Sequence, residues 1–135
     1  MIVFAVLDTN VLVSAFLKSE SVPGTVVREA LEGEIIPLIN EEILEEYENV
    51  LKRKKFRIDA YEVNRFLKDF EKRAINLKGY TSEEVFVDET DVVFFEVVME
   101  ARDQADAYLV TGNTRHFPVR SYVVTPRQML DNLSM

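Results

Sequence analysis

The fold is decided near the start of the chain, by the stretch Ile2-Val3-Phe4-Ala5-Val6-Leu7-Asp8-Thr9-Asn10. Its six apolar residues are typical of a strand that is buried on both faces, as in a parallel sheet. A carboxylate, Asp8, follows at the point where this strand ends. In open parallel sheets, ligands bind outside the carboxyl ends of the strands. We therefore expect Asp8 to lie at a functional edge, with Thr9 and Asn10 turning the chain and capping a helix over 11–17.

The bulk composition predicts one globular domain that spans residues 1–135. Hydrophobic residues make up 47% of the chain and charged residues 30%, which is ordinary for a soluble protein. No apolar run approaches the ~20 residues of a membrane span, and no secretory signal opens the chain. The absence of cysteine excludes disulfides and thiolate metal sites. We therefore expect a cytoplasmic protein that does not interact with membranes.

The net charge of −8 argues against general nucleic-acid binding, because affinity for phosphates comes mainly from Lys and Arg. Either the acidic side chains are spread over solvated faces, or several of them converge on a bound cation. The run Lys52-Arg53-Lys54-Lys55 is a local exception. It can attract RNA phosphates, but a solvated helix end that satisfies the helix dipole is the favoured explanation.

Strands and helices are predicted to alternate along the chain. Apolar runs predict strands at 35–39, 85–87, 107–111 and 122–124 after the first one at 2–7. Helical periodicity and capping residues predict helices at 25–32, 41–55, 59–74 and 92–102 and from 126 onward. Pro37 favours an edge or a strand end for the second strand. This alternation predicts an α/β fold with a parallel sheet and right-handed crossovers.

Three groups of acidic residues can carry chemistry. Asp8 ends the first strand, Asp91 begins a buried helix, and Glu46 and Glu48 border the apolar stripe of the helix at 41–55 on opposite sides. Either glutamate can reach a cleft beside the sheet, and periodicity does not decide between them. Asp91 also has a purely structural interpretation, since acids at helix starts are often caps. Asp88 has that interpretation even more strongly.

Three carboxylates in one cleft repel one another. At ~4 Å each pair costs about 1 kcal/mol in water and about 4 kcal/mol at an effective dielectric constant of 20. Such a cluster is stable only if some carboxyls are protonated or a cation bridges them. Oxygen ligands without Cys or clustered His suit Mg²⁺ or Mn²⁺ better than Zn²⁺. The pattern therefore favours metal-assisted hydrolysis of a phosphodiester.

The chain resembles the PIN-domain ribonuclease family, which includes toxins of toxin–antitoxin pairs. Four segments, spread over nearly the whole chain, carry the resemblance: Val6-Leu7-Asp8-Thr9-Asn10-Val11-Leu12-Val13-Ser14-Ala15, Glu45-Glu46-Tyr47-Glu48-Asn49-Val50-Leu51, Asp88-Glu89-Thr90-Asp91 and Ala105-Asp106-Ala107-Tyr108-Leu109-Val110-Thr111-Gly112-Asn113. The resemblance implies a three-layer α/β/α sandwich around a parallel sheet. It also implies RNA cleavage with Mg²⁺ or Mn²⁺, a cognate antitoxin as a partner, and a homodimer.

Mapped residue by residue, the resemblance implies that the metal ligands are Asp8, Glu46 and Asp91. It thereby selects Glu46 over Glu48, and it gives Asp88 a supporting place at most. The chain departs from the family at Asn113, where many members carry a fourth acid. An amide there can still assist as a ligand or orient a water molecule, but it brings no charge. His116, the one histidine, is interpreted as a loop residue or a phosphate contact.

Two other functions remain open at this stage. A PIN-like module that has lost turnover can bind RNA or a partner protein without cleaving. An enzyme that forms an aspartyl-phosphate on Asp8 is a weaker alternative, because Asp8-Thr9-Asn10 lacks the second acid of the Asp-x-Asp pattern. Thr9, Asn10 and Thr111 lie where they can orient Asp8, although capping and turn formation explain each of them equally well.

Overall fold

The computed structural model describes residues 2–84, 86 and 89–134. Within them a five-stranded sheet has the order β3-β2-β1-β4-β5, and all of its neighbouring strands are parallel. The strands are β1 (Val3–Leu7), β2 (Ile35–Ile39), β3 (Ile75–Asn76), β4 (Ala107–Val110) and β5 (Val123–Val124). The predicted parallel α/β sheet is therefore confirmed.

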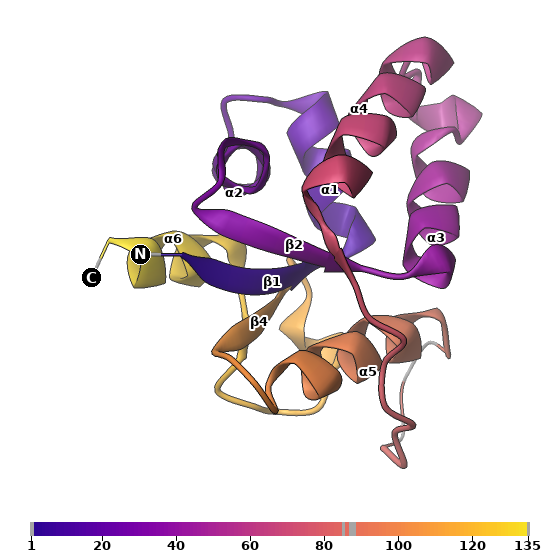
Figure 1. Cartoon of the computed structure of the whole chain (residues 1–135). Coiled ribbons are helices and arrows are strands. Elements are labelled where there is room, and N and C mark those ends of the chain that lie inside the picture. The colour runs from indigo at the N-terminus through magenta and orange to yellow at the C-terminus, as the bar shows by residue number, and fades with distance from the viewer. Residues whose placement is uncertain (1, 85, 87–88, 135) are drawn as a thin grey trace.

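Helices cover both faces of the sheet and form an α/β/α sandwich (Figure 1). On one face lie α1 (Thr9–Leu17), α2 (Val22–Glu32), α3 (Glu41–Leu51) and α4 (Ala60–Arg73). On the other face α5 (Val92–Ala101) packs against β1, β2 and β4. The last helix, α6 (Pro126–Leu133), contacts α2 and β5. None of the helices that the structure describes has the length and apolarity needed to cross a bilayer.

The strand order places the switch point of the sheet, where open α/β sheets typically leave a crevice, beside β1. The chain leaves β1 through α1 and α2 to reach β2 on one side, and α5 later brings it back to β4 on the other side. The two connections run in opposite directions across the sheet. The loops that follow β1 and β4 therefore diverge from each other. This is the place where open α/β sheets bind ligands. Asp8 and Thr111 directly follow β1 and β4 at this point.

Three helix ends differ from the sequence prediction by two residues or more. Helix α1 begins at Thr9, and Asp8 itself is the N-cap, since its side chain accepts the Thr9 N–H. Helix α2 begins at Val22 rather than 25, because the first turn of a helix needs no N–H donors and therefore tolerates Pro23. Helix α3 ends at Leu51, so the basic run follows the helix and leads into the 3₁₀ turn Lys54–Phe56.

The sheet differs from the prediction in two respects. Strand β2 lies inside the sheet although it contains Pro37. The missing N–H is tolerated because β3 pairs only with Leu38 and Ile39, which leaves the outer side of Pro37 unpaired. Strand β3 was not predicted, because two exposed residues carry no periodicity. The strand predicted at 85–87 falls largely outside the residues that the structure describes, and so does Asp88.

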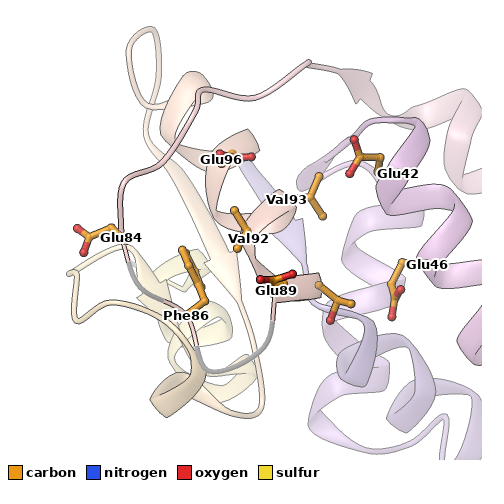
Figure 2. Close-up of a pocket in the computed structure, with 9 residues that line it drawn as sticks. Glu42, Glu46, Glu84, Phe86, Glu89, Val92, Val93 and Glu96 are labelled. Atoms are coloured by element: carbon orange, nitrogen blue, oxygen red, sulfur yellow. The ribbon is translucent and has the colours of Figure 1, made fainter.

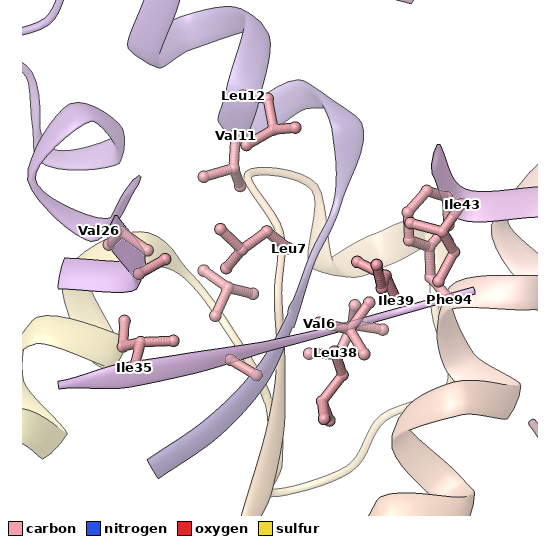
Figure 3. Close-up of a cluster of buried hydrophobic side chains, with 14 of the residues drawn as sticks. Val6, Leu7, Val11, Leu12, Val26, Ile35, Leu38, Ile39, Ile43 and Phe94 are labelled. Atoms are coloured by element: carbon pink, nitrogen blue, oxygen red, sulfur yellow. The ribbon is translucent and has the colours of Figure 1, made fainter. Parts of the chain in front are cut away.

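A buried apolar core joins the sheet to its helices (Figure 3). Val6 and Leu7 of β1 and Ile39 of β2 are almost fully buried. They lie among side chains from α1, α3 and α5, including Leu12, Ile43 and Phe94. Because three elements that carry candidate acids pack into one core, their ends are held in fixed positions around the carboxyl edge of the sheet.

Candidate active site

A hydrogen bond between two strand ends forms the centre of the site. Leu7 of β1 is in register with Val110 of β4, so the residues that follow them are neighbours. The hydroxyl of Thr111 donates to Oδ2 of Asp8 over 2.7 Å, across 103 positions of the sequence. Thr111 is completely buried and Asp8 is 7% exposed. The parallel register therefore places a carboxylate and a hydroxyl together at the bottom of the crevice.

The Asp8 carboxylate is held on both of its oxygens. Oδ1 accepts the backbone N–H of Thr9 at 2.8 Å, and Oδ2 also accepts the side-chain amide of Asn10 at 3.1 Å. Burial raises the pKa of the Asp8 carboxyl above its ordinary value. The hydrogen bonds from Thr111 and Thr9 and the nearby charge of His116 lower it without offsetting the burial. Asp8 is thus a buried, oriented carboxylate that a cation would stabilise in its charged form.

Asp91 lies at the second corner of the site. It ends the 3₁₀ turn Glu89–Asp91 and immediately precedes α5, and it is 8% exposed. Its side chain makes no capping hydrogen bond to α5. The capping interpretation of this acid is therefore wrong. Instead Oδ2 of Asp91 lies 3.5 Å from Nδ1 of His116, whose charge also acts on Asp8.

The two candidate glutamates of α3 lie on different surfaces. Glu46 lines a cavity of about 630 Å³, together with Glu42 on the same helix and Glu89 and Thr90 of the turn before α5. Figure 2 shows Glu42 and Glu46 on the α3 side of this cavity, with Val92, Val93 and Glu96 on the α5 side. Phe86 and Glu84 complete the lining. Neither Asp8 nor Asp91 is among the lining residues described, so the cavity does not join Glu46 to these two acids.

Glu48, in contrast, points away from this cavity. Its carboxylate forms an exposed ion pair with Lys52 at 3.3 Å, one turn further along α3. It also lines a separate groove of about 310 Å³, together with residues of α4 such as Asn64 and Lys68. The side of α3 that packs against α4 is therefore the side of Glu48, whereas Glu46 lies on the side of α5.

Within the part of the chain that the structure describes, the side chain of Asn113 contacts His116 rather than Asp8. Its amide nitrogen lies 3.0 Å from Nε2 of His116, and its backbone N–H donates to the hydroxyl of Thr111 at 3.0 Å. The neighbouring Gly112 N–H donates to Oδ1 of Asn10 at 3.1 Å. Asn10 thereby ties the loop after β4 to the loop after β1, which holds the two walls of the crevice together.

The comparisons with known proteins agree with this architecture. A family model of the PIN domain matches residues 5–115. This range contains Asp8 and Thr111 at the strand ends and the acids Glu46 and Asp91. The chain belongs to the PIN-domain family. No curated protein and no solved structure matches it. PIN domains are generally metal-dependent nucleases and typically use divalent cations, so a nuclease-type function is indicated.

The donors of this PIN domain fit a hard divalent cation in their chemistry. The groups at the crevice are carboxylate, hydroxyl and amide oxygens, which Mg²⁺ and Mn²⁺ prefer. Among the residues that the structure describes, however, no group of three or more Asp, Glu, His or Cys side chains lies close enough together to hold a metal. Asp8 and Asp91 are therefore buried candidate donors, whereas Glu46 is half-buried in the lining of the cavity between α3 and α5.

Tyr47 is a residue of the site that sequence reasoning assigned only to the core. It is completely buried, and its hydroxyl donates to the backbone carbonyl of Leu7 at 2.5 Å. Burial, followed by the charge of Asp8, raises the pKa of Tyr47 well above its ordinary value. Tyr47 thus anchors the helix that carries Glu46 to the end of β1. The sequence did contain a signal for this role, namely the hydroxyl of a tyrosine within an otherwise apolar helix face.

Proposed function

We propose that this PIN domain is an endoribonuclease that hydrolyses RNA phosphodiester bonds with Mg²⁺ or Mn²⁺. In this proposal Asp8, Glu46 and Asp91 hold the cation and Asn113 assists. The observation that carries the proposal is the pair of buried acids at the switch point of the sheet, Asp8 bonded to Thr111 and Asp91 beside His116. Burial of a charged carboxylate is costly unless hydrogen bonds or a cation compensate it.

The roles of the protein groups follow from their contacts. When bound, a divalent cation supplies activation of a water molecule and neutralises charge that develops on the phosphate. Thr111, Thr9 and Asn10 keep the Asp8 carboxylate in one orientation. Tyr47 holds α3, the helix that carries Glu46, against the end of β1. Each of these contacts restricts a ligand-bearing side chain before the cation binds. Less conformational entropy is therefore lost when the cation binds.

RNA as the substrate is supported by a segregation of charge. Residues 52–73 contain nine of the 16 Lys and Arg residues but four of the 24 Asp and Glu residues. Most of these cations are exposed, including Lys54 and Lys55 of the 3₁₀ turn. Lys52 is the residue that follows the end of α3, six residues after Glu46 and about 9 Å along the helix axis. Attraction of phosphates by this basic segment, defined as residues 52–73, opposes their repulsion by the acids.

The proposal is tested by incubating a generic single-stranded RNA with Mn²⁺ and comparing the wild-type chain with Asp91→Ala at matched purity. We expect cleavage by the wild type that EDTA abolishes and that the variant lacks. Equal cleavage by both proteins would mean that a contaminant or another site is responsible. Cleavage that persists in EDTA would contradict metal dependence.

A binding module without turnover is the second candidate. It is favoured by the absence of a three-ligand cluster among the described residues, and by Asn113 in place of a further acid. Such a module retains RNA on a filter in EDTA and in Mn²⁺ alike and leaves the RNA intact. Retention without cleavage over several RNA sequences would favour this candidate over the nuclease.

We further propose that the nuclease is the toxin of a toxin–antitoxin pair, a cytoplasmic protein that forms a homodimer and binds an antitoxin. The resemblance of its four motif segments to such toxins supports this role. Induced expression should then arrest bacterial growth, and Asp8→Asn should relieve the arrest at equal protein level. Growth arrest by both proteins alike would contradict it.

A further inference from the structure

An exposed aromatic ring lies in the first turn of α4. Tyr61 is 65% exposed, and its backbone N–H donates to the side chain of the N-cap residue Asp59 at 2.9 Å. Val63 and Phe70 bury the inner face of α4 in the core. At 3.6 residues per turn, both of them point to the side of the helix opposite Tyr61. The ring of Tyr61 therefore contributes little to the core and is accessible to a partner.

A cation lies against this ring. Arg65, one turn further along α4, places its guanidinium carbon 5.9 Å from the centre of the Tyr61 ring. This is a cation–π contact at an exposed site. A guanidinium group covers only one face of a ring, and the large exposed fraction of Tyr61 leaves the rest of the ring in solvent. Tyr61 and Arg65 thus form an exposed aromatic–cation pair.

The pair lies within the basic segment 52–73. Two of its nine Lys and Arg residues, Lys52 and Arg73, form ion pairs. The other seven form no ion pair with any acid in the described part of the chain. A second cation–π contact in the segment joins Lys55 to the half-buried ring of Phe56 at 5.1 Å. Single-stranded nucleic acid is bound by this combination, in which cations attract phosphates and rings stack on bases.

The connection between two helices links the pair with the candidate site. Helices α3 and α4 lie side by side (Figure 1), and α3 carries Glu46. Lys52 and the 3₁₀ turn Lys54–Phe56 connect the end of α3 with the start of α4. A strand that leaves the carboxyl edge of the sheet along α3 therefore meets the unpaired cations first and Tyr61 after them.

We propose that Tyr61 and Arg65 form a stacking platform for an unpaired base of single-stranded RNA. The platform deepens the proposed function, because RNA as the ligand rests on it. It also restricts the substrate to RNA with accessible bases, since the bases of a duplex are stacked on one another and offer no free face to a side chain. Lys54 and Lys55 attract the phosphates that flank the stacked base. The platform itself needs neither a metal nor cleavage.

The platform is tested by binding in EDTA, followed by the fluorescence anisotropy of a labelled, unstructured single-stranded RNA. We expect Tyr61→Ala to weaken binding about 5- to 150-fold, the range for loss of one base–aromatic stack. Tyr61→Phe keeps the ring and should bind like the wild type. Tyr80→Ala removes a second exposed tyrosine and should also bind like the wild type. Equal binding by wild type and a Tyr61→Ala protein of unchanged Tm would overturn the proposal.

An abasic RNA strand separates stacking from the attraction of phosphates. It retains the ribose–phosphate chain but carries no bases, so Tyr61→Ala and the wild type should bind it equally. The dependence of affinity on salt should stay the same in Tyr61→Ala, which removes no charge, and become shallower in Arg65→Ala. A loss of affinity in Tyr61→Ala that is as large on the abasic strand as on the complete RNA would overturn stacking.

The platform and the nuclease fail in different ways. If the wild type binds RNA through Tyr61 but does not cleave it in Mn²⁺, the nuclease is wrong and the platform stands. If the wild type cleaves RNA, Tyr61→Ala should raise the KM about 5- to 150-fold and leave kcat unchanged. An unchanged KM would overturn the platform and leave the nuclease intact. If the wild type binds no single-stranded RNA, both proposals fail, and a protein becomes the partner to seek for the exposed pair.

Discussion

The carboxyl edge of the sheet and the basic segment 52–73 are opposite in charge and in construction. At the edge, Asp8 and Asp91 are buried, and Asp8 is fixed by hydrogen bonds from three different residues. In the basic segment most charged side chains are exposed, and pairs such as Arg73 with Asp69 lie on one helix face. Rigid, desolvated acids suit chemistry at one point, whereas mobile, solvated cations suit attraction over a distance.

The largest effect is expected at the buried acids. Asp8→Asn keeps the size of the side chain but removes the charge, so it should reduce Mn²⁺-dependent cleavage at least about 100-fold. The rate of RNA cleavage at saturating substrate measures this loss. Asp131→Asn, an exposed exchange of the same kind on α6, should retain the wild-type rate. Full activity of Asp8→Asn, with contaminating nuclease excluded, would remove the edge of the sheet from the mechanism.

Substitutions of the two glutamates of α3 compare a proposed metal ligand with an exposed acid on the same helix. Glu46 is proposed to hold the cation, so Glu46→Gln should lower kcat about 10- to 100-fold. Glu48→Gln breaks only an exposed ion pair with Lys52, worth less than about 1 kcal/mol, and should change kcat less than about twofold. Purified variants and one RNA substrate suffice for this measurement. A larger loss in Glu48→Gln than in Glu46→Gln would reverse the assignment.

Charge reversal tests the basic segment. The double variant Lys54→Glu/Lys55→Glu should raise the KM for RNA roughly tenfold and leave kcat unchanged, because these cations attract phosphates and touch no reacting group. The salt dependence of KM should become shallower in this variant. The matched control Lys18→Glu/Arg127→Glu makes the same charge change at exposed positions on other elements. An equal rise in KM in the control would mean that net charge alone matters.

The smallest effect concerns stability. The pKa of Asp8 is raised in the folded chain, so its ionisation disfavours folding at pH values above that raised pKa. This cost diminishes as the pH falls and vanishes below the unfolded-state pKa of about 3.9. Asp8→Asn should therefore raise Tm at pH 7 and lose this advantage in acid. Thermal unfolding without metal, followed by circular dichroism across pH, measures it. A Tm gain that grows on acidification would contradict the burial argument.

Most elements of the fold could be predicted because local signals mark their ends. Gly33 ends α2 with a left-handed backbone, Asn40 and Asp59 cap α3 and α4, and Thr125 forms a capping box with Gln128. Each signal acts within one turn of a helix. Strand β3 could not be predicted in this way, since its pairing with β2 is the only feature that makes it a strand.

The candidate site, like the fold, could be predicted only where the signals are local. Asp8 and Asp91 could be singled out from the sequence, because a strand end and a helix start are local features. The surface that Glu46 and Glu48 each face could not, since both residues border one apolar stripe. The packing of α4 on one side of α3 and α5 on the other separates them. Selection of Glu46 as a ligand rested on the family resemblance and stays a prediction.

By itself the sequence determined the alternation of strands and helices, the membership in the PIN-domain family and the acidic residues available for chemistry. Periodicity, caps and motif spacing are encoded over short stretches of chain, so these features needed no coordinates. The tertiary structure alone decided the contacts between Asp8 and Thr111, Tyr47 and Leu7, and His116 and its neighbours. Parallel strand register and helix packing bring together residues that are as many as 103 positions apart in the sequence. No local sequence pattern indicates which of these distant residues will meet.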